Sequence, residues 1–486
     1  MGVSFVTQIV DTLNGIIWSD ALVYLCLITG LYFSLKMKFF QVRHIKDMVK
    51  LLFKGSDSEK GVSSFQAFAL SVSGRVGTGN IAGVATAIAM GGPGALFWMW
   101  AIAFLGAGSA YVESALAQVY KVEKDGEYRG GPAYYIEKGL GMKWYAITFA
   151  VATVVAMGFF LPGVQSNSIA AGINNAFGVS PYVTASILVL LLGVIIFGGV
   201  KRIGKAAEII VPFMAIGYIL VALIIIIVNI TKLPEVIALV FKSAFALEPA
   251  LAGIIGMAIS WGVKRGIYSN EAGQGTGPQA AAAAEVSHPA KQGLVQAFSV
   301  YIDTLFVCSA TGFMILITGM YNIVNPDGGF LVENMPGVAI GPAYTQKAVE
   351  TLFPSFGSAF VAIALFFFAF TTLMAYYYIA ETNVAYLINK GNNKVLINAL
   401  RVALLASIFY GAIRTAELAW GLGDIGVGLM AWLNIIAIIL LRKPAFDTLK
   451  DYEEQVSQGK DPVFDPVKLG IKNADFWLKY NAKKTN

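Results

Sequence analysis

Two glycine-rich stretches carry polar residues inside otherwise apolar sequence. The first is SVSGRVGTGNIAG at 71–83, and the second is ISWGVKRGIYSNEAGQGTG at 259–277. Glycine clusters of this kind interrupt a helix and leave backbone N–H and C=O groups without their helical partners. Freed N–H groups attract an anion, and freed carbonyls coordinate a cation such as Na⁺. The stretches therefore predict binding chemistry, although glycine that serves only close helix packing is the alternative.

Residues for covalent catalysis are scarce. The chain has two histidines and two cysteines, so Ser-His and Cys-His catalysis, histidine metal sites and a disulfide framework lack their parts. GLGD at 421–424 matches a short signature of intramembrane aspartyl proteases, which need a second, facing aspartate. Asp303 is the candidate partner, but it lacks the tyrosine-aspartate context. An intramembrane enzyme is therefore the least favoured alternative.

The elements that position these residues must be membrane helices. Of the 486 residues, 57% are hydrophobic and only 13% are charged, which excludes a soluble protein. The apolar residues are spread from 16 to 441, which also excludes a single-span receptor. An all-α polytopic membrane protein remains, because lipid offers the backbone no hydrogen-bond partner.

A bilayer core needs about 20 apolar residues per helix, and about eleven stretches qualify. Read between polar breaks, the predicted spans are 16–36, 61–90, 94–120, 144–174, 181–199, 206–229, 249–283, 292–320, 355–388, 395–413 and 421–441.

The loop charges orient these spans. Most Lys and Arg residues fall in alternate loops and in the tail, and cytoplasmic loops carry such an excess. The N-terminus is therefore expected outside and the C-terminus in the cytoplasm of a multi-pass cell-membrane protein. Topology also accounts for the net charge of +6, so no nucleic-acid partner is expected.

The glycine clusters lie in the second and seventh spans, and each of these spans opens a block of five. Because five is odd, the second block must be inverted relative to the first. The resulting organisation is an extra N-terminal helix with its loop (1–60), a first repeat (61–230), an inverted second repeat (249–441) and a solvated cytoplasmic tail (442–486). Discontinuous helices at matching positions of inverted repeats indicate a secondary transporter with its binding site at the midplane.

With these residues in hand, the sequence resembles the sodium:alanine symporter family, the alanine or glycine:cation symporters of the LeuT-like inverted-repeat fold. The resemblance covers about residues 15–445. Its main carriers are VGTGNIAGVATAIAMGGPGALFWMW at 76–100 and KRGIYSNEAGQGTGPQAAAAAEVSHPAKQG at 264–293. It implies a Na⁺-driven importer of small neutral amino acids, with five-plus-five core helices and one extra N-terminal helix.

The resemblance also assigns roles to the first glycine cluster. VGTGN at 76–80 looks like the broken first core helix, whose amides bind the substrate carboxylate. Those amides would belong to Thr78 and Gly79, with Gly77 beside them. The side-chain oxygen of Asn80 would serve a cation or the substrate.

A sodium site is implied between the broken helix and the ninth span. By resemblance, its ligands are the carbonyls of Ser73 and Val76 and the hydroxyls of Thr371 and Thr372. Uncharged oxygens suit a monovalent hard cation better than Ca²⁺. The alternative for the two threonines is hydrogen bonding of their hydroxyls to carbonyls one turn earlier.

Two further segments are expected at the substrate. In the seventh span the break is predicted at Ser260, Trp261 and Gly262, with Ile267 to Gln274 as the alternative. In the fourth span Phe159 would limit substrate size and Gln165 would give a polar contact. The alternative there is a packed aromatic ring and an amide that satisfies a proline kink.

Charges at membrane depth are costly unless paired or hydrated, and they suggest function or gating. Arg75 is expected to pair with Glu271 or Glu381 and to help close the cytoplasmic path. The predicted function is Na⁺-coupled import of alanine or glycine by alternating access. A proton-coupled amino-acid permease, using one of the buried carboxylates in place of Na⁺, is the runner-up.

Overall fold

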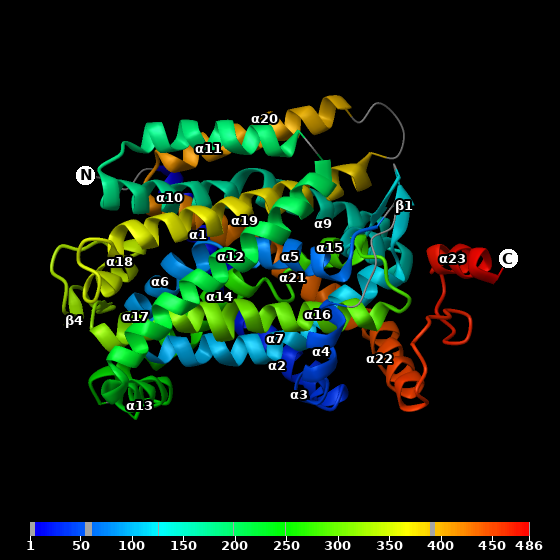
Figure 1. Ribbon diagram of the computed structural model, residues 1–486, viewed down its shortest axis with the longest axis horizontal. Helices are drawn as coiled ribbons and strands as arrows, with labels where there is room; N and C mark the ends of the chain where they lie inside the picture. The colour runs from blue at the N-terminus through cyan, green and yellow to red at the C-terminus, as the bar shows by residue number, and fades with distance from the viewer. Residues whose placement is uncertain are drawn as a thin grey trace.

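The computed structural model describes residues 5–53, 61–124, 126–197, 199–247, 249–388 and 394–485. These residues are mostly helical, and the helices form one bundle (Figure 1). Within these described ranges, seven helices are long and apolar enough to cross a membrane, and α1 with α2, bent by 40°, can count as an eighth span.

The first part of the chain supplies the extra N-terminal helices, the first broken helix and the long helix after it. These elements are α1 (Phe5–Ile17), α2 (Asp20–Lys36), α3 (Phe40–Arg43), α4 (Ile45–Leu52), α5 (Ser64–Arg75), the π-helical turn η1 (Gly79–Gly83), α6 (Val84–Gly91) and α7 (Gly94–Val119). A capping box between Ser63 and Gln66 starts α5. The first predicted span covers α2, and α1 precedes it as a separate helix.

The next part begins with a short antiparallel hairpin and continues with helices. They are β1 (Val122–Lys124), β2 (Glu127–Arg129), α8 (Pro132–Tyr135), η2 (Ile136–Leu140), α9 (Lys143–Val155), η3 (Ala156–Phe160), α10 (Leu161–Phe177), α11 (Pro181–Ile196) and α12 (Gly199–Val228). The π-helical turn η3 joins α9 to α10, so the predicted fourth span is one long, locally widened helix.

The second broken helix lies in the third part of the chain. Its elements are η4 (Ile230–Lys232), α13 (Leu233–Ala244), η5 (Pro249–Ile254), α14 (Ile255–Asn270), α15 (Gly277–Ala283), α16 (Pro289–Tyr301), the π-helical turn η6 (Ile302–Cys308) and α17 (Ser309–Thr318). Both glycine clusters therefore interrupt helices, as predicted.

The last part holds a second hairpin, three long helices and the tail. The elements are β3 (Asn322–Val324), β4 (Phe330–Glu333), α18 (Pro342–Glu350), α19 (Gly357–Leu387), α20 (Lys394–Ala412), α21 (Ala416–Leu440), α22 (Arg442–Ser457) and α23 (Asp475–Thr485). Helix α7 packs on α14 and α16, and α19 packs on α5, α10 and α12. The two broken helices thus lie inside the bundle.

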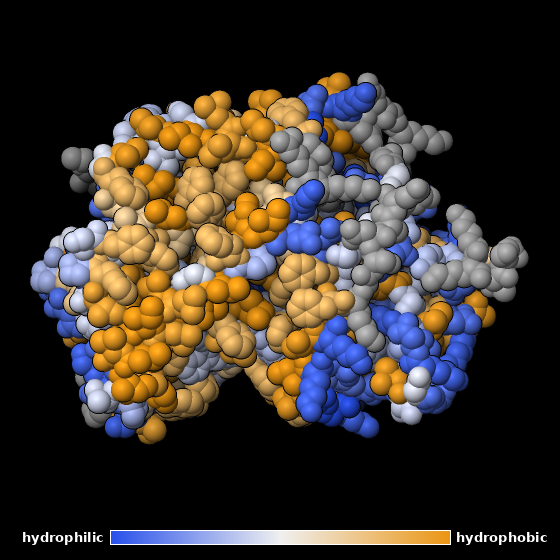
Figure 2. Space-filling view, viewed as in Figure 1, coloured by the Kyte–Doolittle hydropathy of each residue, from blue (hydrophilic) through white to orange (hydrophobic). Residues whose placement is uncertain are grey.

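The surface agrees with a membrane protein. In Figure 2 hydrophobic residues cover the middle of the visible face, and hydrophilic residues gather toward its two ends, around α18 and around α22. Large apolar side chains such as Phe213, Leu190 and Ile209 are exposed. Exposure of this kind is costly in water and is accommodated by lipid.

Parts of the tail pack on the bundle, whereas the sequence predicts a solvated extension. Trp477 is fully buried, and its indole N–H donates to the carbonyl of Gln118 at the end of α7. The ammonium group of Lys121 lies 4.6 Å from the Phe476 ring and 5.2 Å from the Trp477 ring. Aromatic residues scattered at a chain end carry no helix-length apolar run, so hydropathy alone does not reveal that they pack on the bundle.

A histidine connects the tail to the start of α16. The Nδ1 atom of His288 accepts from the amide of Ala290, and its Nε2 atom lies 3.1 Å from Oδ2 of Asp451 in α22. A neutral ring with its proton on Nε2 satisfies both partners. Burial lowers the pKa of His288, and the hydrogen bond from His288 lowers the pKa of Asp451.

We predict that mild acid loosens the tail. The folded state lowers the pKa of His288, so its stabilising contribution is complete above the unfolded value of about 6.5 and is lost as pH falls through the folded value. Trypsin cleavage of the tail at Lys472, followed between pH 7.5 and about pH 5, should therefore accelerate beyond the enzyme's own pH dependence. His288→Asn keeps an acceptor for the helix start but does not titrate, so its cleavage should not show that acceleration. An identical acceleration in both proteins would contradict the prediction.

Candidate functional site

The first break opens directly after α5. Val76 and Gly77 leave the helix, and the amide of Gly77 donates to Oδ1 of Asn80 at 2.8 Å. The amide of Thr78 donates to Oε1 of Gln165 at 3.0 Å. Two backbone amides of the break are thus satisfied by side-chain oxygens, and the side-chain oxygen of Asn80 faces the backbone of its own segment.

Close approach explains the glycines here. A Cβ atom on Gly77 would lie 2.4 Å from Oγ1 of Thr372, and one on Gly79 would lie 3.0 Å from Cα of Ser269. The first distance is far inside van der Waals contact. Gly77 therefore lets α19 approach the break, and Gly79 lets α14 approach it.

Three of the four predicted sodium ligands come together. The Oγ1 atom of Thr372 lies 2.9 Å from the carbonyl oxygen of Ser73, 3.4 Å from that of Val76 and 3.0 Å from that of Phe368. A hydroxyl has one proton to donate, so it cannot satisfy three acceptors at once. A surplus of oxygen lone pairs gathered at the end of α5 is the environment that a hard monovalent cation favours.

Thr371 lies apart from this group. Its hydroxyl donates to the carbonyl of Phe368 at 2.9 Å and faces the sulfur of Met214, 3.9 Å away. Thr371 therefore reaches the Phe368 carbonyl that Thr372 also contacts but does not face the carbonyls of Ser73 and Val76. Its role as a cation ligand stays a prediction. Adjacent residues project about 100° apart around a helix, so only one of the two hydroxyls faces α5.

The second break is held by a buried glutamate of α7. The backbone amides of Gly273 and Gly275 donate to the two carboxylate oxygens of Glu113 at 3.3 and 3.2 Å. The side chain of Asn434 donates to the same carboxylate at 2.7 Å and to the Gly273 carbonyl at 2.9 Å. The irregular residues 271–276 thus obtain partners from two helices. The sequence marks Glu113 as a charge at membrane depth but does not reveal this role.

The two breaks also meet at a single carboxylate. Oδ1 of Asp303 in η6 accepts from Nδ2 of Asn80 at 2.6 Å and from the Ser269 hydroxyl at 3.1 Å. Oδ2 accepts from the Thr304 hydroxyl at 2.7 Å. Asp303 therefore ties η1 to the end of α14 across the middle of the bundle.

The predicted break at Ser260, Trp261 and Gly262 is wrong. Helix α14 runs through all three residues and ends at Asn270, inside the alternative range. A Cβ atom on Gly262 would lie 2.6 Å from the carbonyl oxygen of Ala95 in α7. This glycine therefore serves close helix packing.

The two residues predicted in the fourth span differ in position. Phe159 is 45% exposed on the outside of the bundle, so its predicted role in limiting substrate size is wrong. A π-helical turn adds a residue to the helix and rotates the turns beyond it, which sequence periodicity cannot anticipate. Gln165 is buried against Thr78, and its Nε2 atom donates to the Tyr376 hydroxyl at 3.3 Å.

The predicted pairing of Arg75 is also wrong. Its guanidinium donates to the carbonyl of Gln296 at 3.1 Å and to the hydroxyl of Ser299. In the described part of the chain no carboxylate lies within ion-pair distance of it, neither Glu271 nor Glu381.

Two other charged groups flank the breaks. Glu381 lies near the C-terminal end of α19, and its carboxylate is 3.5 Å from Arg129 at the end of β2. On α14, before its break, Arg265 binds both oxygens of Asp424 at 2.8 and 2.9 Å, and Lys264 lies 2.8 Å from the same carboxylate. Asp424 is thus fully engaged by cations, which removes the free facing aspartate that a protease pair with Asp303 would need.

The described residues contain no cluster of three or more His, Cys, Asp or Glu side chains suited to a metal ion. The oxygens gathered around Thr372 at the first break belong to carbonyl groups and a hydroxyl group. Together with the buried amides of the break, this arrangement suits reversible binding of a small ion and a small polar molecule.

Comparison with known proteins gives concordant matches. The sequence profile of the sodium:alanine symporter family matches residues 3–466. The chain is 68% identical to the Bacillus subtilis protein YrbD, provisionally named a sodium/proton-dependent alanine carrier, over 97% of each chain. It is 56% identical to a sodium/proton-dependent alanine carrier protein of Bacillus sp. PS3, over 88% of this chain and 97% of that protein. It is 47% identical to GlnT of B. subtilis, named a probable sodium/glutamine symporter, over 94% of this chain and 93% of that protein.

We predict that Asp424 is essential for stability. Asp424→Asn leaves two cations buried without a full counter-charge, and breaking a buried pair typically costs about 3–5 kcal/mol of unfolding free energy. Thermal unfolding of the detergent-solubilised protein should shift strongly downward. Asp447→Asn, which removes the partner of the exposed Lys443, should change the unfolding free energy by less than about 1 kcal/mol. Equal shifts for the two variants would contradict the assignment.

Proposed function

The chain belongs to the sodium:alanine symporter family, and from this premise we propose that it couples inward Na⁺ movement to import of small neutral amino acids. Alanine is the principal substrate and glycine a second one. Of the three relatives reported above, two are named as alanine carriers.

The crowding of oxygens at Thr372 carries this proposal. A Na⁺ ion would take the place of the single hydroxyl proton among the carbonyls of Ser73 and Val76. Ser73 lies in the last turn of α5 and Val76 directly follows that helix, so the ion would stabilise the helix end against its own partial charge. Binding of Na⁺ would thereby fix the neighbouring break in the conformation that receives the substrate.

The substrate would bind on the other side of the same break. The amides of Thr78 and Gly79 lie at the start of η1, where a carboxylate is favoured. The substrate carboxylate would displace Gln165 from the Thr78 amide, and the freed Gln165 side chain would then contact the bound molecule. Every residue from 76 to 80 is buried, which would favour a substrate with a small side chain.

Alternating access would use two ion pairs that flank the breaks. The Arg265–Asp424 pair closes one side of the breaks, and the Arg129–Glu381 pair closes the side of the β1–β2 hairpin. In the proposed topology of eleven spans in five-plus-five inverted repeats, the N-terminus lies outside and the tail in the cytoplasm. The first pair is then the outer gate and the second the inner gate.

Proton coupling is the second candidate. It is favoured by the buried Asp303, which accepts a hydrogen bond directly from Asn80 at the break. Two of the relatives carry both sodium and proton in their names. Protonation of Asp303 would change how strongly it holds Asn80, and so would act on the same element as Na⁺.

We predict that substitutions of the two adjacent threonines have different effects in a transport assay. Thr372→Ala removes the hydroxyl that faces Ser73 and Val76, so the Na⁺ concentration for half-maximal alanine uptake should rise about tenfold or more, which corresponds to about 1.4 kcal/mol or more of binding free energy. Thr371→Ala, whose hydroxyl faces Phe368 and Met214, should stay within about threefold of wild type.

The measurement is uptake of radiolabelled alanine into proteoliposomes under imposed Na⁺ or pH gradients. Uptake in the wild-type protein that follows only the pH gradient would favour the proton-coupled candidate. If neither gradient drives uptake, the symporter proposal fails. A stronger effect of Thr371→Ala than of Thr372→Ala would overturn the cation site described above.

A further inference from the structure

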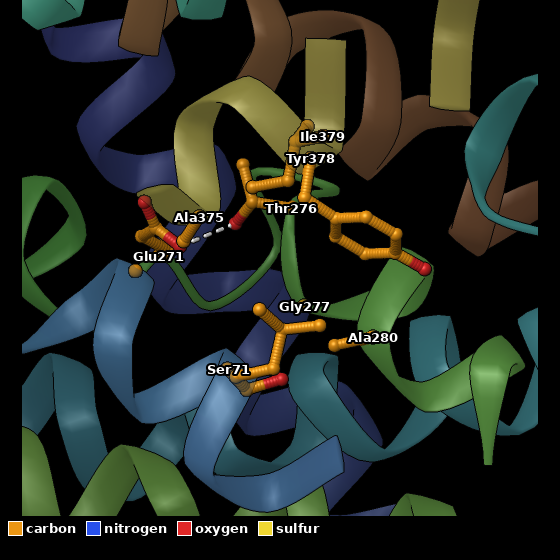
Figure 3. Close-up of a pocket in the computed structure, with 10 residues that line it drawn as sticks. Ser71, Glu271, Thr276, Gly277, Ala280, Ala375, Tyr378 and Ile379 are labelled. Atoms are coloured by element: carbon orange, nitrogen blue, oxygen red, sulfur yellow. Dashed lines mark hydrogen bonds between the residues drawn. The ribbon is translucent and has the colours of Figure 1, made fainter. Parts of the chain in front are cut away.

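The side chains drawn in Figure 3 enclose a small cavity between α5, residues 271–276 and α19. Its volume is about 10 Å³, about the space needed by one water molecule, so these elements pack closely on one side of the breaks. The other side, toward α6 and α14, lies to the left of α5 and α15 in Figure 1. There charged and aromatic side chains around Asp424 hold the bundle together, and the N-terminal helices contribute to this group.

The side chains around Asp424 cover the first break. A Cβ atom on Gly83, the last residue of η1, would lie 3.8 Å from Cη2 of Trp420 and 3.9 Å from Cδ of Arg265. The guanidinium of Arg265 lies 4.5 Å from the centre of the Trp420 ring. The Tyr268 ring packs against Trp420 with 4.9 Å between the ring centres. A molecule that enters between α14 and α21 would therefore have to displace these side chains.

Trp18 contacts both halves of this ion pair. It is buried in the bend between α1 and α2, and its indole N–H donates to the backbone carbonyl of Asp424 at 2.8 Å. The ammonium group of Lys264, which binds the Asp424 carboxylate, lies 5.5 Å from the centre of the Trp18 ring. A cation within about 6 Å of an indole ring is attracted to the negative face of its π system. Trp18 therefore connects the backbone of α21 to a charged side chain of α14.

Helix α1 is attached to α21 by two further hydrogen bonds to backbone carbonyls. The side chain of Asn14 donates to the carbonyl of Gly421 at 2.9 Å, and the indole N–H of Trp432 donates to the carbonyl of Ile17 at 2.9 Å. Gly428 allows the two helices to approach, because a Cβ atom there would clash with the Ile17 side chain. We therefore expect α1 and α21 to move as one body.

Helix α14 is held to this body through the side chains of Lys264 and Arg265. Both bind the Asp424 carboxylate, and Lys264 also lies over the Trp18 ring. Contacts between side chains can break while the helices that carry them stay intact. Opening on this side would therefore separate Lys264 from Asp424 and from Trp18 in one step.

We propose that Trp18 is a positioning residue of the outer gate. It holds Lys264 at Asp424 and so sets how firmly α14 stays closed on α21. The extra N-terminal helices thereby take part in alternating access, because Trp18 stays with α21 when Lys264 leaves. This inference rests on the symport function and on the outer gate proposed above. A tryptophan that served only to pack the bend would be buried as well, but its loss would not act through Lys264.

The test compares Trp18→Phe with Trp432→Phe. Each substitution removes one indole N–H that bonds α1 to α21, at 2.8 and 2.9 Å, but Trp18 is the one with Lys264 over its ring. Alanine uptake into right-side-out membrane vesicles gives the half-saturating external alanine concentration and the maximal rate. Trp18→Phe should lower both severalfold, because a looser gate exposes the site to the outside more often and closes over the substrate less readily. Trp432→Phe should leave both within about twofold of wild type.

A Lys264→Met background separates positioning from packing. If Trp18 acts through Lys264, adding Trp18→Phe to Lys264→Met should change neither quantity further, whereas a packing role predicts the same shift in both backgrounds. Trp18→Tyr, which also lacks the indole N–H, takes the place of Trp18→Phe if that variant does not reach the membrane.

Equal effects of the Trp18 and Trp432 substitutions, or the same Trp18 shift with and without Lys264, would overturn the positioning role while leaving the symport function standing. Absence of any Na⁺-driven or proton-driven uptake in wild type would instead refute the proposed function itself.

Discussion

An interrupted helix inside a membrane protein has to find partners for its backbone within the protein, because lipid supplies none. At the first break these partners are the side-chain oxygens of Asn80 and Gln165, and at the second they are the two oxygens of Glu113. The rest of the architecture serves this requirement. Helices α7, α10 and α21 carry the polar side chains that satisfy the breaks, and glycines allow those helices to approach. Around Thr372 three carbonyl oxygens share one hydroxyl donor, and this is the place that we propose for an ion.

The general plan could be predicted from the sequence, since hydropathy and glycine clustering act over many residues. Both interruptions occur in the predicted spans, and Ser73, Val76 and Thr372 meet as the family resemblance implied. The positions of individual side chains depend on how each helix is rotated about its own axis, and composition carries no information about that rotation. Gly262 and the glycines after Asn270 look alike in the sequence, yet the first packs against Ala95 and the others form the break.

The partners of buried charges were harder still to predict. Depth in the membrane shows that Arg75 must be compensated, but it does not show that carbonyl and hydroxyl oxygens will do so. In the sequence Asp424 stands out only as part of a protease signature, although its partners Lys264 and Arg265 lie in the broken helix that it faces. Pairing is a property of distances between segments far apart in the chain. A single sequence does not contain those distances.

The burial of Trp477 has a consequence for any shortening of the tail. Its indole donates to Gln118 at the end of α7, and the ammonium group of Lys121 lies against the rings of Phe476 and Trp477. Lys121 is itself buried, with the carbonyl of Ala284 as a hydrogen-bond partner. Removal of the segment from Phe476 onward would therefore take the aromatic neighbours from a buried cation and open the end of α7 to water. The tail is thus a part of the folded bundle, although its sequence looks like an appendage.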